Sequence, residues 1–439
     1  MLSADRSRPP ALLASDRSRP PALLRSDRSR HPRKLLAASA LGLALALVSG
    51  ATPAVAGPAA GTLPAISAAP GTLAPGVTYR EFTRPTAGVE VPLHLVEVDL
   101  RNPLVTVDLI TAGAVAARAP ISAQADSRRA IAAVNGDFFN ISNTQPGVEV
   151  TGSAVGPAIS GGDELKAAVP NGQRFGPGLP PGTATSDVLG VGVDRVGRLA
   201  RVSLKGTVSA GRDRFPVTGF NQYALPVGGV GVFDSDWGGV SRKRSTCGTD
   251  TDRAAPCSTD TYELSVRHGR VVRTGIEPGT GAIARDTVVL VGREQGAQAL
   301  RRFEVGDRVR VDYDLVPDTR LPFRFAVGGF PILQDGEPLA GLDGRTAAIR
   351  TAAGVSADGR RLFLLAVDGA GPGLTILDLA LTLRELGAAG AVNLDGGGST
   401  TLVTRTVAEP AVEVRNHPSG GAERPVPNGI GVFSRLDSR

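Results

Sequence analysis

The sequence is poor in aromatic residues, histidine and cysteine. Only 4% of the 439 residues are aromatic, and the chain holds four His, two Cys, one Trp and one Met. Because the histidines are few and far apart, they give little support to a His-rich zinc site or a Ser-His-Asp triad. By contrast, 56 Gly and 33 Pro residues are present. This composition is typical of many turns and short strands, and it argues against a helical bundle.

The net charge of +6 comes from the N-terminal segment. Nine of the 48 Lys and Arg residues and three of the 42 Asp and Glu residues lie within residues 1–56, which leaves 39 of each sign in the remainder. The chain beyond residue 56 is therefore neutral overall. We expect no nucleic-acid partner and no general attraction to an anionic membrane.

Three segments precede the globular part of the chain. Residues 1–29 repeat SDRSRPPALL at a spacing of 11 residues. Such polar, Pro-bearing units cannot stack a core, so they are either a disordered repeat or sequence upstream of the true start. Residues 30–56 have the basic start, 14-residue apolar run and Ala54-Val55-Ala56 end of a signal peptide. Residues 57–75 are rich in Ala, Gly, Pro and Thr and predict a flexible linker.

The signal peptide predicts a secreted or cell-envelope protein. Its apolar run is too short to span a bilayer comfortably, so we expect no stable membrane span. It contains no Cys, which excludes a lipid anchor at the cleavage site. Outside the cytoplasm, nearby cysteines usually pair, and we expect a disulfide between Cys247 and Cys257, which lie in one polar loop.

Residues 76–435 predict one α+β domain, with a mixed β-sheet and a few helices. Alternating segments such as HLVEVDL and VTVDLI indicate strands on either side of a turn. From about 188 to 320 the signals are strands and turns without a long helical period. We interpret this stretch as a β-rich insertion that carries the cysteine loop.

The C-terminal part predicts a strand–helix–strand unit. RLFLLAV (361–367) is a continuous apolar run, as expected of a buried strand. Thr375 opens a segment with helical spacing that Gly387 ends, and AVNL (391–394) follows as a second strand. Two such strands in one sheet run parallel and are joined by a right-handed crossover. Asp368 and Asp395 follow the two strands, which places them at the same ligand-binding edge.

Two carboxylates at such an edge have three common uses. They bind a divalent cation, act on a glycosidic bond as an acid, base or nucleophile, or cap turns. The Gly run after Asp395 favours close approach of backbone N–H groups to an anionic ligand, with a flexible loop as the alternative. The guanidinium of Arg350 could bind a phosphate through two parallel hydrogen bonds. The alternative is that Arg350 lies on a solvent-exposed face. Asn135-Gly136-Asp137 suits either a turn or a pocket floor.

Several segments together resemble the phosphodiester glycosidase family. The LDGGGS element with its upstream helix is the most specific, the RTAxG element is less so, and NGxFF is weak alone. The family's bacterial members are exported and often linked to surface polysaccharide. The resemblance covers about residues 75–435 and rests on AVNGDFFN (133–140), GGFPILQDG (328–336), RTAAGVSADGRRLFLLAVDG (350–369), GLTILDLALTLRELGAAGAVNLDGGGSTTLV (373–403) and ERPVPNGIGVF (423–433).

This resemblance implies roles for individual residues. Asp395 and Asp368 are expected to be catalytic. Asp137 stands where many members have Gly, and its extra carboxylate suggests a metal ligand. No cofactor is implied with certainty, and a divalent cation such as calcium is the alternative. The expected substrate-binding residues are Asn135, Gly136, Arg350, Thr351, Asn393, Gly396, Gly397, Gly398 and Ser399.

The resemblance implies an exported hydrolase that cleaves the glycosidic bond of a carbohydrate phosphodiester, such as a GlcNAc-phosphodiester or an envelope glycopolymer. Two other functions remain open from the sequence. One is a non-catalytic protein that binds phosphorylated envelope glycopolymer, although two carboxylates would repel the phosphate. The other is a metal-dependent phosphoesterase that cleaves P–O instead of C–O, although the scarcity of His argues against a transition-metal pair.

Overall fold

A computed structural model describes residues 71–86 and 88–437. The repeat at 1–29, the signal peptide at 30–56 and all but the end of the linker at 57–75 lie outside these residues. Gly71–Ala74, at the end of the expected linker, forms strand β1. Among the described residues, no helix is long and apolar enough to cross a membrane.

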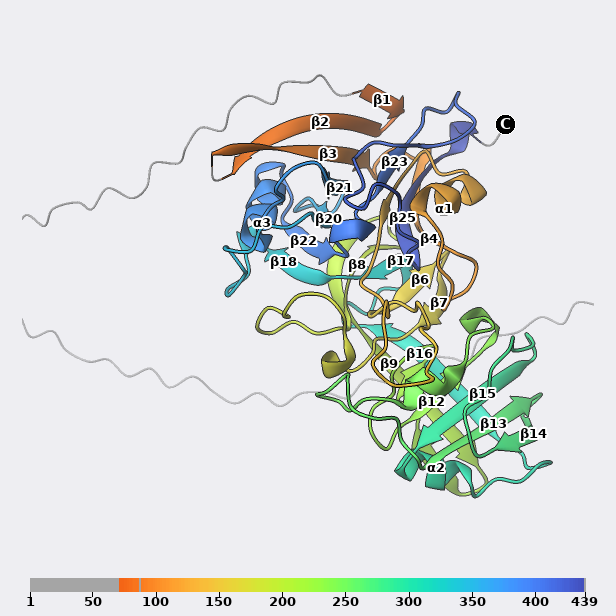
Figure 1. Cartoon of the computed structure of the whole chain (residues 1–439). Coiled ribbons are helices and arrows are strands. Elements are labelled where there is room, and N and C mark those ends of the chain that lie inside the picture. The colour runs from red at the N-terminus through yellow and green to blue at the C-terminus, as the bar shows by residue number, and fades with distance from the viewer. Residues whose placement is uncertain (1–70, 87, 438–439) are drawn as a thin grey trace, which may run out of the picture. The chain divides into compact units, whose positions relative to one another are not determined.

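The described residues fold mainly into antiparallel β-sheets (Figure 1), with three α-helices. The predicted α+β class is therefore wrong. The helices are α1 (Ile121–Arg128), α2 (Gln295–Leu300) and α3 (Ile376–Glu385). Among the described residues, every strand pair is antiparallel except that of β11 (Gly219–Phe220) with β12 (Val230–Phe233).

The first sheet has eight strands and carries most of the family-like segments. In spatial order it consists of β1, β2 (Val77–Thr86), β3 (Val89–Asp99), β21 (Arg361–Val367), β20 (Thr351–Val355), β22 (Gly390–Leu394), β18 (Phe330–Gln334) and β19 (Glu337–Pro338). The two strands of the predicted strand–helix–strand unit do not pair with each other in this sheet. β20 lies between β21 and β22 and pairs antiparallel with both, so the strands before and after α3 are not neighbours.

A five-stranded sheet packs against one face of the first sheet. Its order is β24 (Glu413–Val414), β23 (Leu402–Thr404), β5 (Ala132–Asn135), β25 (Asn428–Ser434) and β4 (Val105–Thr111). Alternate residues of β21 explain its continuous apolar run. Leu362 and Leu364 join the core shared with this sheet, whereas Phe363 and Leu365 pack with α3 on the opposite face.

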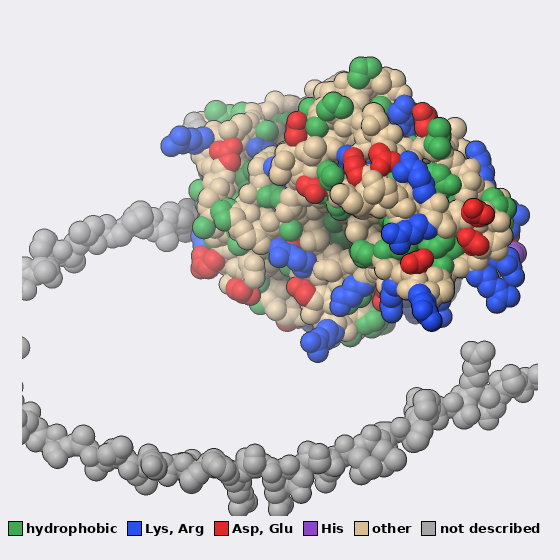
Figure 2. Space-filling view, turned by 90° about the horizontal axis from the view of Figure 1, so that it is seen from below, with side chains coloured by type: hydrophobic (Ala, Val, Ile, Leu, Met, Phe, Trp, Pro, Cys, Tyr) green, Lys and Arg blue, Asp and Glu red, His purple; other side chains and the backbone are tan. Residues whose placement is uncertain are grey.

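Two further sheets contain the segment from about 188 to 320. One has the order β10 (Asp213–Pro216), β9 (Gly197–Ala210), β8 (Asp187–Gly192), β17 (Phe323–Gly328), β6 (Ala158–Ser160) and β7 (Asp163–Lys166), with β16 (Arg310–Pro317) also on β9. The other has β11 (Gly219–Phe220), β12 (Val230–Phe233), β15 (Thr287–Arg293), β13 (Thr261–Arg267) and β14 (Arg270–Gly275). Basic and acidic side chains are interspersed over the face in Figure 2, and basic ones gather toward one margin.

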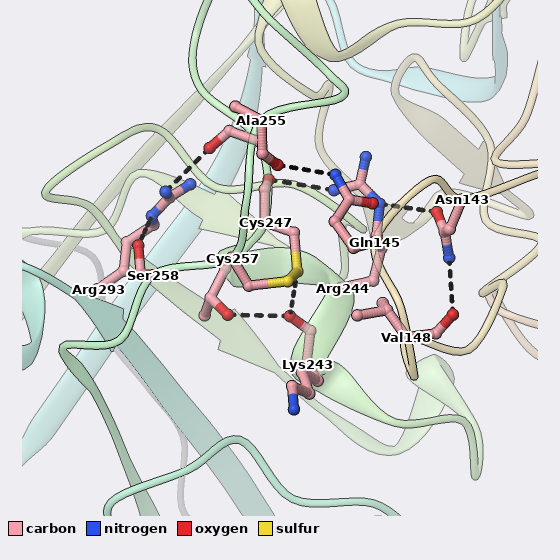
Figure 3. Close-up of a disulfide and its surroundings, with 12 residues drawn as sticks. Asn143, Gln145, Val148, Lys243, Arg244, Cys247, Ala255, Cys257, Ser258 and Arg293 are labelled. Atoms are coloured by element: carbon pink, nitrogen blue, oxygen red, sulfur yellow. Dashed lines mark hydrogen bonds between the residues drawn. A yellow bond between two sulfur atoms is a disulfide. The ribbon is translucent and has the colours of Figure 1, made fainter.

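The predicted disulfide is present in this segment. Cys247 and Cys257 are joined (Figure 3), and the surrounding loop is also held by side chains from other elements. Arg244 Nη1 donates to the carbonyl oxygen of Cys247 over 3.1 Å, and Gln145 Nε2 donates to that of Ala255 over 2.8 Å. The bond therefore fastens a loop that is already packed against the domain.

Candidate active site

The strand register places both predicted aspartates at one edge of the first sheet. Thr351 pairs with Ala366 on one side and with Leu394 on the other. Ala366, Thr351 and Leu394 are thus aligned across three strands. Asp368 comes two residues after Ala366 at the end of β21, and Asp395 comes directly after Leu394 at the end of β22. Arg350 precedes β20 between them. The carboxylates of Asp368 and Asp395 nevertheless have different partners.

Asp395 is held by the glycine loop that follows it and by Arg424. Burial raises the pKa of Asp395 to about 7 and outweighs hydrogen bonds from Ser399 and the Gly396 backbone, as well as the positive charge of Arg424. The negative charge of Asp137 raises this pKa further. Arg424 Nη1 also donates to Ser399 Oγ over 3.2 Å. Asp395 thus has the acid–base properties of a group that exchanges protons near neutral pH.

The glycines let neighbouring chains approach Asp395 closely. A Cβ on Gly396 would lie 2.6 Å from the carbonyl oxygen of Ile349, and one on Gly398 would overlap the Arg424 guanidinium. The backbone N–H groups of Gly397 and Ser399 donate to protein carbonyls. The Gly396 N–H donates a hydrogen bond to the Asp395 carboxylate. All three backbone N–H groups therefore bind protein oxygens and stabilise the loop conformation.

Asn135 ties the two sheets together behind this loop. Its side chain is fully buried. Nδ2 donates to the Asp395 carbonyl oxygen over 2.7 Å, and Oδ1 accepts from Thr351 Oγ1 over 2.8 Å and from the Thr401 N–H. Thr351 in turn contacts Thr400. Asn135 and Thr351 therefore position the Asp395 loop, and neither side chain is open to solvent.

Gly136 and Asp137 lie beneath the same loop. The Gly136 carbonyl accepts from the Asp395 N–H over 2.9 Å, and its own N–H donates to the Asn428 carbonyl. Asp137 is buried, which raises its pKa to about 6 despite a backbone hydrogen bond from Gly156 and the nearby Lys166 ammonium. One carboxylate oxygen accepts from the Gly156 N–H, and the other has no hydrogen-bond partner among the described residues.

The described residues do not form a complete cation site around Asp137. No group of three or more His, Cys, Asp or Glu side chains within them is arranged to hold a metal ion. Lys166, whose ammonium donates to three backbone carbonyls including that of Gly156, occupies the region beside Asp137. One free carboxylate oxygen beside an ammonium does not match the six to eight oxygen ligands that Ca²⁺ takes.

Asp368 lies between two histidines. His94 Nε2 is 3.0 Å and His417 Nδ1 is 2.9 Å from Asp368 Oδ2. Burial would raise the pKa of Asp368, but hydrogen bonds from the backbone N–H groups of His417 and Ala370 and from both imidazoles lower it to about 2. Asp368 is therefore ionised at all ordinary pH values, and its oxygens are already occupied by donors.

Arg350 and Asn393 complete the predicted set. Arg350 is half-buried, and its guanidinium donates to the carbonyl oxygens of Leu374 and Thr346. Asn393 is buried, and neither its side-chain nitrogen nor its oxygen has a partner among the described residues. Arg350 therefore lies at the edge with its guanidinium bound to two carbonyls, whereas Asn393 lies below the surface.

Residues 260–433 match the phosphodiester glycosidase family. The family resemblance expected from the sequence is thereby confirmed. The match covers less than half of the chain. It includes Arg350, Asp368 and the Asp395 loop, and it leaves out the Asn135 to Asp137 segment. No curated protein matched the sequence.

Two solved structures share the fold. A hypothetical protein from Synechocystis is 21% identical, with a TM-score of 0.64, over 82% of this chain and 62% of that one. This chain thus spans less than two thirds of that protein. A Burkholderia pseudomallei protein described as exported is 22% identical, with a TM-score of 0.58, over 78% and 74% of the two chains. The pro-peptide-inhibited catalytic domain of zebrafish N-acetylglucosamine-1-phosphodiester alpha-N-acetylglucosaminidase is 15% identical, with a TM-score of 0.42, over 82% and 85%.

Within the part that matches the phosphodiester glycosidase family, the structure adds two residues to the predicted site. Arg424 and His417 both lie in the polar segment between β24 and β25. Arg424 stands inside ERPVPNGIGVF, which the resemblance already included, so this segment was the available signal. His417 had no comparable signal, because its link to Asp368 depends on tertiary packing.

Proposed function

We propose that this protein is an exported phosphodiester glycosidase that cleaves the C1–O bond of a sugar-1-phosphodiester. The observation that supports the proposal is the environment of Asp395. This residue has a pKa of about 7, is influenced by the charge of Arg424 and lies in the region that matches the family. A carboxylate that ionises near neutral pH can take a proton from water or attack an anomeric carbon. The neighbouring arginines supply the positive charge that a phosphodiester requires.

The residues divide the reaction between two tasks. Asp395 acts as base or nucleophile toward C1, because Asp368 is already saturated with hydrogen-bond donors. Arg424 and Arg350 bind the phosphate, which leaves as a monoester. Asn135, Gly136 and Thr351 hold the Asp395 loop in place. No step requires a metal ion.

The leader supports export. Residues 30–56 have the three parts of a signal peptide, and a disulfide such as Cys247–Cys257 forms in oxidising compartments. The substrate class that fits an exported enzyme is a phosphodiester-linked sugar of the cell envelope.

The test is incubation of the purified protein with an α-GlcNAc-1-phosphodiester, with and without chelator, and identification of the products by mass. We expect free sugar and a phosphomonoester in both conditions. Sugar phosphate and an alcohol, formed only without chelator, would show a metal-dependent phosphoesterase. Binding of phosphorylated glycopolymer without any product would show a non-catalytic binding protein.

Asp395→Asn is the matched variant for the same assay. We expect it to lower turnover by at least about 10³-fold, because it removes the group that acts at C1. Its unfolding midpoint should stay close to that of the unaltered protein, since Asn keeps the size of the side chain. Unchanged turnover would remove Asp395 from the reaction.

A further inference from the structure

His417 is an exposed histidine whose inner ring nitrogen is fixed. Nδ1 lies 2.9 Å from Asp368 Oδ2, and the backbone N–H of His417 donates to the same oxygen over 3.0 Å. The His417 side chain is 79% exposed, whereas that of Asp368 is 3% exposed. Asp368 therefore sets the orientation of the ring and leaves Nε2 on the solvent side. This is the arrangement by which a buried carboxylate orients a catalytic imidazole.

The second histidine keeps Asp368 in its ionised, accepting state. His94 is buried, and Tyr79 Oη lies 2.9 Å from its Nδ1. Nε2 of the same ring lies 3.0 Å from Asp368 Oδ2, so Tyr79 and Asp368 occupy both ring nitrogens of His94. Because the ring is also buried, His94 does not face a ligand. Tyr79, His94 and Asp368 form a fixed support behind His417.

The loop that carries His417 is attached to the Asp395 loop at two points. Asn416 Nδ2 donates to the Thr400 carbonyl over 2.9 Å. At the other end, Arg424 donates to Ser399, which also contacts Asp395. His417 therefore belongs to a segment fastened along the same edge that holds Asp395 and Arg350.

The charges around His417 favour its protonated form. The hydrogen bond and negative charge of Asp368 raise the pKa of His417, and Glu81 on β2 raises it further. The other titratable groups on the elements packed there are His94 on β3, Tyr79 on β2 and Arg415 on the same loop, whose guanidinium lies over the Tyr79 ring. These charges extend the pH range over which the imidazole keeps its proton.

We propose that His417 is a further catalytic residue, the general acid that protonates the departing phosphate. The proposal rests on the glycosidase function proposed above. As the C1–O bond breaks, its electron pair passes to the phosphate oxygen, and Nε2–H of His417 gives that oxygen its proton. Water adds to C1, either directly or after an Asp395 intermediate, and its proton passes to Asp395. Asp395 then gives this proton to solvent, solvent reprotonates His417, and the products are free sugar and a phosphomonoester.

The experiment compares His417→Gln with His268→Gln across pH, using the same α-GlcNAc-1-phosphodiester. His268 is the matched control, because it is also exposed and lies near a carboxylate, Asp286, but in the β-rich segment. We expect His417→Gln to lower kcat by about 10²-fold or more, within the range for loss of a general acid. The decline of kcat at alkaline pH should disappear only in this variant, and imidazole should partly restore His417→Ala.

The outcomes separate this proposal from the function on which it rests. Hydrolysis by the unaltered protein, with His417→Gln keeping the rate and pH profile of His268→Gln, overturns the role of His417 alone. No hydrolysis by the unaltered protein overturns the proposed function and the His417 role together. Thermal unfolding of both variants checks that each is folded, as expected for exposed side chains.

Discussion

Arg424 lowers the pKa of Asp395 by its positive charge, against the opposing effect of burial. Replacing Arg424 by Gln should therefore raise that pKa above about 7. In the proposed reaction Asp395 acts in its ionised form and Arg424 binds the phosphate. The substitution should therefore make kcat/KM begin to fall at a higher pH on acidification, and it should raise KM. A pH profile of kcat/KM measures both effects. Arg212→Gln, at an exposed turn, is the control and should leave the profile unchanged.

At Gly136 even one added carbon atom should destabilise the fold. A Cβ there would overlap Asn428 Oδ1, and both residues belong to the support of the Asp395 loop. Gly136→Ala should lower the free energy of unfolding by about 1–3 kcal/mol, as measured by urea denaturation. Gly178→Ala, which meets no atom within 4 Å, is the control. Equal effects of the two substitutions would contradict this explanation.

At the residue level, the sequence predicted the positions that end strands and missed those that reach the site from elsewhere. Asp368 and Asp395 were found because each follows an apolar run and precedes glycine. His94 and His417 looked unrelated, since 274 and 49 positions separate them from Asp368. No local pattern records such a contact. The sequence also did not show that Asn135 would be buried and fully bonded.

Among the elements, the cysteine loop carries the clearest stability prediction. The disulfide closes a short loop, with a sequence separation of 10. Replacing both Cys247 and Cys257 by Ala should lower the free energy of unfolding by about 2–3 kcal/mol, since the unfolded chain regains loop freedom. Arg244 and Gln145 hold the same loop and should keep it folded. The unaltered protein in reductant should match the variant, and a much larger loss would mean that the bond organises the whole segment.

The order of strands was the main failure at the level of elements. RLFLLAV and AVNL were recognised as strands, and the capping of α3 by Thr375 was also recognised. TAAGV, the strand β20 between them, consists mostly of small residues and has a weak strand signal. The prediction therefore placed the two longer strands in one sheet without the strand that lies between them. The strands were therefore predicted better than their pairing.

For the molecule as a whole, composition indicated many turns and strands but did not fix the fold class. The high Gly and Pro content agrees with the many short strands of four sheets. The α+β class was inferred from a few expected helices, although most of the domain has no helical period. Pairing across hundreds of residues, such as β3 with β21, decides the architecture and leaves no local trace.

The attachment of the 416–424 loop to Asp395 and Asp368 also sets the order in which the candidate site is assembled. Asp368 and Asp395 are made before His417, Arg424 and Asn428, so a chain that emerges from its N-terminus has both aspartates before it has their partners. The order of residues along the chain therefore completes the surroundings of both aspartates only after the 416–424 segment has been made.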